Sequence, residues 1–208
     1  MLDNLVKIYD DFAKSGRIQD LEQLAKELGY PFAKRMPFGP QTTEIKGFNL
    51  FSKKGSKRFI GVISIPAKAF KGSIRFYDYL NTRDLETSTH SVIEIHCEDL
   101  YTDEFIIQPK GALRKMKGLF VAPSNPFPHL KDFNSKFEIS AYYEGSILKE
   151  SALDLMVDFP GITCEAEGNY LIFYYRKKEI PIAEIIDIVA FAEEFVRLTK
   201  FDTSDDYV

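Results

Sequence analysis

Between residues 44 and 108 the sequence repeatedly alternates apolar and polar residues, and each alternating stretch ends at a turn of a few residues. Alternation of this kind predicts β-strands. Turns this short force neighbouring strands to run antiparallel, because a parallel return needs a crossover of about a dozen residues. We therefore predict a meander-like antiparallel sheet with strands at Glu44–Ser52, Lys57–Ile65, Ser73–Leu80, Ser88–Glu98 and Phe105–Gln108.

Helical spacing of apolar residues on both sides of this region predicts helices that pack their apolar stripes on the sheet. Gly29 stands where a left-handed helix end is expected, and Pro181 stands at the first turn of the last helix. Between Pro37 and Gln41 we expect a loop, and between Val121 and Phe133 an irregular segment. The further predicted elements are helices at Leu2–Phe12, Ile18–Leu28, Ser146–Val157 and Pro181–Lys200, a helical turn at Gly111–Lys117, and strands at Lys136–Tyr143, Ile162–Ala166 and Tyr170–Tyr175.

These elements predict one α+β domain over residues 1–208, with a mainly antiparallel sheet covered by N-terminal, middle and C-terminal helices. Eighteen Phe and eleven Tyr with no Trp strengthen the expectation of a sheet, because aromatic side chains favour half-buried pleated surfaces. Within the domain we expect a helical arm at 1–30, a strand region at 44–109, and a strand-helix-hairpin-helix region at 136–200.

Composition excludes several classes of protein. A formal net charge of -4 repels a phosphate backbone, so nucleic acid is not expected as a partner. Cys97 and Cys164 have no CxxC spacing, which predicts reduced, buried thiols and neither a disulfide framework nor a zinc site. Charges interrupt the apolar residues of Met1–Lys14, unlike a signal peptide, and Gly118–Leu130 is too short to span a bilayer. We therefore expect a cytoplasmic protein without a membrane span.

One cluster of ionisable residues lies on a single predicted strand. Alternation places His90, Glu94 and His96 on one face, with Glu94 and His96 about 7 Å apart along the strand at roughly 3.3 Å of rise per residue. These two residues are close enough to share an ion if a neighbouring strand supplies a third ligand. The competing interpretation, which we favour, is a solvated sheet face.

Asp78 is the second candidate, because the pleat places its carboxylate in a row with Ile74, Phe76 and Leu80. A carboxylate among apolar side chains needs a hydrogen-bond partner or a raised pKa. That situation is typical of binding sites. It is also explained if Asp78 accepts backbone N–H groups from the expected turn at Asn81, which is the simpler interpretation.

Two groups of basic residues and one proline-rich loop complete the candidates. Either basic group could bind phosphate, although charged hairpin ends also prevent association between sheet edges. The loop from Pro123 to Leu130 could line a pocket or simply cross the sheet. The basic groups are Lys53, Lys54, Lys57 and Arg58, and Lys110, Arg114, Lys115 and Lys117.

The order of several short motifs resembles a widespread family of uncharacterised bacterial proteins over about residues 20–200. In that family the strands carry an aromatic-Asp-Tyr motif, a Thr-x-x-x-Val motif, a Phe-x-x-x-Pro motif and a late element with Phe and Gly-Asp. Many members have an N-terminal membrane anchor, which we do not expect here. The resemblance implies a fold and no chemistry, and Tyr77 departs from it by separating Phe76 from Asp78. The segments concerned are Leu24–Ala25, Leu28–Gly29, Phe76–Tyr79, Ser88–Val92, Phe105–Pro109, Asn134–Phe137, Tyr142–Gly145 and Leu171–Tyr175.

No complete catalytic motif, cofactor fingerprint or metal-ligand set occurs in the sequence, so we predict no catalytic residues and no cofactor. The leading hypothesis is a non-enzymatic binding or protein-interaction module, for which the aromatic-rich sheet could offer a surface. The alternative is a small-ligand or metal-binding protein, or an enzyme, that uses His96, Glu94 and Asp78. A homodimer formed through the last helix is a third possibility.

Overall fold

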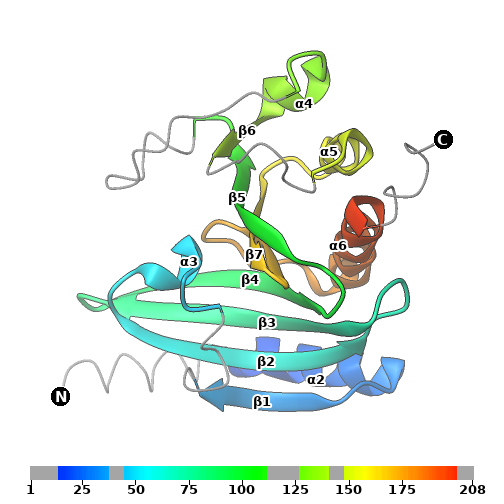
Figure 1. The fold of residues 1–208 in the computed structure, drawn as a ribbon. Coiled ribbons are helices and arrows are strands. Elements are labelled where there is room, and N and C mark those ends of the chain that lie inside the picture. Colours follow the sequence, from blue (N-terminus) through cyan, green and yellow to red (C-terminus); the bar gives the residue numbers. More distant parts are fainter. Residues whose placement is uncertain (1–13, 38–44, 112–126, 141–147, 201–208) are drawn as a thin grey trace.

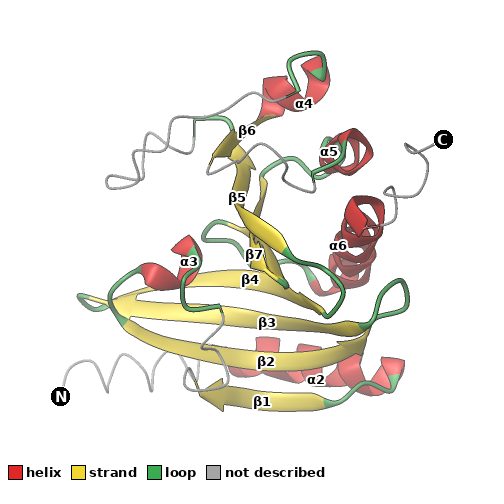
Figure 2. Ribbon diagram, in the orientation of Figure 1, coloured by secondary structure: helices red, strands yellow, loops and turns green. Residues whose placement is uncertain are grey.

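Eight antiparallel strands form one sheet, and this confirms the predicted α+β fold class (Figures 1 and 2). The structure, a computed structural model, describes residues 14–37, 45–111, 127–140 and 148–200. The strands are β1 (Phe32–Pro37), β2 (Ser56–Pro66), β3 (Gly72–Arg83), β4 (Glu86–Cys97), β5 (Thr102–Pro109), β6 (Phe137–Ser140), β7 (Ile162–Gly168) and β8 (Tyr170–Tyr175). The helices are α2 (Ser15–Leu28), α3 (Asn49–Ser52), α4 (Lys131–Lys136), α5 (Glu150–Met156) and α6 (Ile185–Lys200), with a 3-10 turn at Ile182–Glu184.

The strand order is β1-β2-β3-β4-β8-β7-β5-β6, so β2 to β4 are adjacent as in the predicted meander, whereas β5 is separated from β4. The β7–β8 hairpin, which comes late in the chain, lies between β4 and β5. Sheet twist turns the second half of the sheet, and Figure 1 shows β5 rising steeply from the direction of β1–β3. No described helix is long and apolar enough to cross a bilayer.

One face of the sheet carries the main apolar core, which α2, α5 and α6 cover. Leu21 of α2 packs against a bulge in β2, where Gly61 has a φ of 62°. A Cβ on Gly61 would lie 2.3 Å from Leu21 Cδ1, so only glycine allows this approach. The helix ends as predicted, with Gly29 in the left-handed conformation at φ 71°.

The opposite face is aromatic and polar, and α3 covers part of it. Phe51 of α3 packs edge-on against Tyr79, with ring centroids 4.9 Å apart. Glu165 of β7 accepts hydrogen bonds from the backbone N–H groups of Asn49 (2.6 Å) and Leu50 (3.2 Å). A buried carboxylate from a distant strand therefore binds the free donors at the start of this short helix.

Three local predictions were wrong. The segment predicted as a strand at Glu44–Ser52 contains α3, because Glu165 and the packing of Phe51 outweigh its alternating pattern. The strand β1 was missed, since prolines stand at both of its ends and it lies at the sheet edge. The irregular segment before Phe133 contains the start of α4. The predicted helix at Leu2–Phe12 and most of Gly111–Lys117 lie outside the described residues.

Candidate functional site

The structure divides the predicted site residues between the two faces of the sheet. In the β3–β4 register Asp78 lies opposite Ser91, whereas Arg75 lies opposite Glu94. Because successive side chains alternate between faces, Asp78 faces the helices, and Glu94 and His96 face the other way. The three residues therefore do not form one site.

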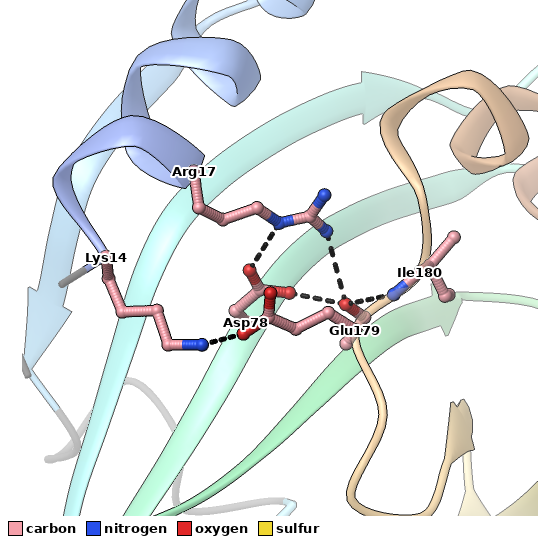
Figure 3. Close-up of polar contacts among 6 residues, drawn as sticks. Lys14, Arg17, Asp78, Glu179 and Ile180 are labelled. Atoms are coloured by element: carbon pink, nitrogen blue, oxygen red, sulfur yellow. Dashed lines mark hydrogen bonds and ion pairs between the residues drawn. The ribbon is translucent and has the colours of Figure 1, made fainter.

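Asp78 is completely buried and belongs to a network that joins α2 to the sheet (Figure 3). Arg17 of α2 donates its Nε–H to Asp78 Oδ2 at 3.0 Å, and Ser91 donates its hydroxyl to Asp78 Oδ1 at 2.5 Å. The backbone N–H of Ile180 donates to Ser91 Oγ at 2.9 Å. We call these four residues the Asp78 network. The partner of this carboxylate is thus an arginine on another element, and not the turn near Asn81.

The Asp78 network explains why Ser91 is not an activated nucleophile. Its hydroxyl donates a hydrogen bond to Asp78 Oδ1, and its oxygen accepts one from the N–H of Ile180. An activated serine gives its proton to a base that can pass it on to a leaving group. Here the acceptor is an ion-paired aspartate, so the arrangement holds α2, β3, β4 and the β8–α6 connection together.

Glu94 and His96 have separate partners on the aromatic face. Glu94 is buried, pairs with Arg75 at 2.5 Å, and accepts the hydroxyl of Tyr77 at 2.9 Å. His96 stacks on Tyr170 with ring centroids 4.6 Å apart and an interplanar angle of 26°. In the part of the chain that the structure describes, no three His, Cys, Asp or Glu residues are placed to hold a metal ion.

A different site lies at the end of the sheet where the β3–β4 hairpin projects, as a cleft of about 900 Å³. That volume is within the usual range for small-molecule sites. Every described residue that lines it is polar or charged, and we call this site the cationic cleft. Its basic residues are Lys14, Lys53, Lys54, Arg83, Lys177 and Lys178, its acidic residues are Asp84, Glu86 and Glu179, and its neutral residues are Asn81, Thr87, Ser88 and Thr89.

The fold brings these basic residues from four segments. Lys14 precedes α2, and Lys53 and Lys54 follow α3. Arg83 ends β3, and Lys177 and Lys178 follow β8. Lys177 has a φ of 51°, which a non-glycine residue rarely adopts, and its backbone N–H donates to His90 Nδ1 at 3.1 Å. The buried ring of His90 thus holds the turn that presents both lysines to the cleft.

Positive charge in the cleft is only partly compensated. Lys14 pairs with Glu179, and Arg83 pairs with Asp84 at 3.0 Å. Lys53 forms no ion pair with another described residue. Loss of surrounding water, followed by repulsion from Arg176 and Lys177, lowers the pKa of Lys53. Among the described residues, the cleft therefore has an excess of cations.

The basic residues of the cleft also affect the pKa of the buried His90 ring. Burial, followed by repulsion from Lys53, lowers the pKa of His90 to about 4, and Arg176 and Lys177 contribute further repulsion. The imidazole is consequently neutral at pH 7. A negative charge placed in the cleft would oppose this repulsion and raise the pKa of His90.

The sequence identified only part of this cleft. Lys53 and Lys54 belonged to a basic group for which phosphate binding was one interpretation. Lys57 and Arg58 of the same group bond instead to the Phe51 carbonyl and, at 3.4 Å, to Thr82 Oγ1. No local sequence pattern connects Lys53 and Lys54 with the other basic residues of the cleft, because the four segments meet only in the folded chain. These other residues are Lys14, Arg83, Lys177 and Lys178. The second basic group lies mostly outside the described residues, as does the loop before Phe127.

Comparison with known proteins identifies a similar fold and no family. No family model matches the chain, and no curated protein matches it either. A solved structure of the mycobacterial trehalose monomycolate transport factor A, TtfA, is similar with a TM-score of 0.60 and 11% identity. The match covers 88% of this chain and 96% of that chain. At this identity the similarity shows a shared fold alone, and membership of the uncharacterised bacterial family stays a prediction.

Proposed function

We propose that this protein is a non-enzymatic binding module and that its cationic cleft binds an anionic group of a partner or small ligand. The observation that carries the proposal is that, of the residues that the structure describes, six basic and only three acidic ones line one cleft. The basic residues come from four separate segments, and Lys53 has no acidic partner among the described residues. An anionic ligand would supply the missing charge.

The buried carboxylates support binding over catalysis. Asp78 is paired with Arg17, Glu94 with Arg75 and Tyr77, and Glu165 with the backbone of α3. A catalytic acid or base must exchange protons with a bound substrate. These groups instead bond to other parts of the fold, which gives each of them a structural role.

The charge of the whole protein restricts the kind of anion. A net charge of -4 repels an extended polyanion, whereas a short anionic group within the cleft experiences mainly the nearby lysines. The structurally similar mycobacterial protein is named as a transport factor, and a factor that acts by binding is compatible with this proposal.

Calorimetric titration with inorganic pyrophosphate at low ionic strength tests the proposal. We expect binding that weakens as salt is added, because screening reduces the attraction between exposed charges. The double variant Lys53→Ala/Lys177→Ala should weaken pyrophosphate binding by about tenfold or more, the effect expected when a charge-assisted hydrogen bond is lost.

The matched control is Lys26→Ala/Lys131→Ala, which removes the same charge from two exposed helix positions outside the cleft. It should bind pyrophosphate like the wild type. An independent readout is the pKa of His90 from the NMR signals of its ring, which should rise when pyrophosphate is bound. Equal binding by the cleft and control variants, or a His90 pKa that does not move, would contradict the proposal.

A further inference from the structure

The cationic cleft is large and has no apolar wall among its described residues. Its volume of about 900 Å³ lies near the upper end of the range for small-molecule sites, so it can hold a ligand larger than a single anionic group. Most ligand pockets are lined mainly by apolar and aromatic side chains. Here all of the described lining residues are polar or charged, which favours a ligand whose whole surface is polar.

This polar lining also distinguishes between the kinds of anion that a cationic site attracts. A nucleotide base is commonly held by stacking on an aromatic side chain, and an acyl chain needs an apolar wall. None of the described lining residues provides either contact. The described walls of the cleft are therefore better suited to a small anion that carries further polar groups.

The acidic residues of the cleft indicate what those further polar groups are. Glu179 pairs with Lys14 (Figure 3), and Asp84 pairs with Arg83 at 3.0 Å. Glu86 is exposed at the start of β4 and forms no ion pair with another described residue. Its carboxylate repels a bare anion, but it accepts hydrogen bonds and so favours a ligand that brings O–H donors to it.

Hydroxyl groups of the protein line the cleft next to Glu86. Thr87, Ser88 and Thr89 follow it along β4 and line the same cleft. The hydroxyl of Thr87 is bonded to that of Thr82 at 2.9 Å, whereas the side chain of Thr89 forms no hydrogen bond with another described residue. Because a hydroxyl both donates and accepts, Thr89 can bond to the hydroxyl groups of a ligand.

We propose that the ligand of the cationic cleft is a small anion rich in hydroxyl groups, of the class of phosphorylated sugars and polyols. The inference rests on the proposed function and names the class of its ligand. Lys53 and Lys177 bind the phosphate, while Glu86 and the hydroxyl of Thr89 bind the hydroxyl groups. Such a ligand uses both the basic and the acidic residues of the cleft, whereas a bare anion would use the basic residues alone.

Calorimetric titration of the full chain with two matched phosphate monoesters tests the inference. Inositol monophosphate and cyclohexyl phosphate have the same carbon ring and the same phosphate, but only the first carries hydroxyl groups on its ring. We expect inositol monophosphate to bind about tenfold more tightly, the effect of about one hydrogen bond. Equal binding of the two esters, or tighter binding of cyclohexyl phosphate, would overturn the inference.

The variant Glu86→Ala separates hydroxyl recognition from attraction between charges. It should bind inositol monophosphate about fivefold more weakly, because an acceptor for hydroxyl groups is lost. It should bind pyrophosphate slightly more tightly, because one negative charge is removed. The matched control Glu104→Ala removes the same charge from an exposed position of β5 outside the cleft and should bind both ligands like the wild type. Tighter binding of both ligands by Glu86→Ala would contradict the inference.

The inference and the proposed function fail in different ways. If Lys53→Ala/Lys177→Ala weakens pyrophosphate binding but the wild type does not distinguish the two esters, the cleft binds anions without recognising hydroxyl groups. That result would refute the inference alone. If neither pyrophosphate nor either ester binds, the proposed function is refuted as well.

Discussion

The Asp78 network and the cationic cleft lie side by side at one end of the sheet, yet their charges are arranged in opposite ways. In the Asp78 network each charged group has a partner, with Arg17 on Asp78 at 3.0 Å (Figure 3). Among the described residues of the cleft the basic ones outnumber the acidic ones, and Lys53 lies close enough to Arg176 and Lys177 to be repelled by them. Paired charges hold the elements together, whereas under the proposed function the excess of basic residues binds an anionic ligand.

The largest expected effect is the loss of the buried carboxylate. Asp78→Ala should lower the free energy of unfolding by about 3–5 kcal/mol, because it leaves Arg17, whose side chain is only 11% exposed, without its charge partner. Urea denaturation measures this change. The double variant Arg17→Leu/Asp78→Leu should regain part of the loss, since it removes both charges together. A loss below about 1 kcal/mol for Asp78→Ala would show that the pair is not structural.

The next effect is a pH dependence that arises from His90. Its pKa in the folded protein is about 4, below the ordinary value of 6.5, so the unfolded chain binds the proton more tightly. Stability from this group is therefore complete above about pH 6.5 and is lost as the pH falls through about 4. A difference of this size corresponds to about 3 kcal/mol in total.

The variant His90→Asn isolates this contribution, because it keeps a hydrogen-bond acceptor but does not titrate. Comparison with the wild type is needed since burial raises the pKa of Glu165, whose contribution to stability changes in the opposite direction with pH. Unfolding measured between pH 4 and 7 should be less pH-dependent in the variant. Identical curves for the two proteins would contradict the assignment.

A smaller effect tests whether His96 belongs to the binding site. His96→Ala removes the stack on Tyr170 and should cost about 1 kcal/mol of stability. Pyrophosphate binding should be unchanged, because His96 lies outside the cleft. Loss of pyrophosphate binding in this variant would indicate that the ligand site lies on the aromatic face and not in the cleft.

Elements that depend on local signals were predictable from the sequence. Gly29 ended α2 and the short turns set β2 to β4 antiparallel, because these features need only neighbouring residues. The placement of β8 beside β4 was not predictable, since it joins residues about 80 positions apart through side-chain packing that no short pattern encodes. The alternating pattern at Glu44–Ser52 failed for the same reason, because the contact that fixes α3 comes from Glu165.

The candidate site likewise contains residues that the sequence indicates and contacts that it does not. The pleat correctly placed Asp78 in an apolar row, but Arg17, its partner, lies on another element and could not be identified from spacing. The cationic cleft depends on four segments and on the turn at Lys177, which has no glycine or asparagine to mark it. The sequence therefore indicates which charged residues need a partner, but not which residues on other elements are those partners.

Lys53 should give the smallest change in stability, and the sign of that change distinguishes the cationic cleft from the Asp78 network. Lys53→Met keeps most of the aliphatic stem and removes a cation that Arg176 and Lys177 repel, so the folded state should become slightly more stable. Because Lys53 is exposed and solvent screens it, the gain should be about 0.5 kcal/mol or less. The same variant should bind pyrophosphate more weakly, as expected where a site keeps unpaired charge at the expense of stability. A clear loss of stability would instead place Lys53 with Asp78, among the groups that hold the fold together.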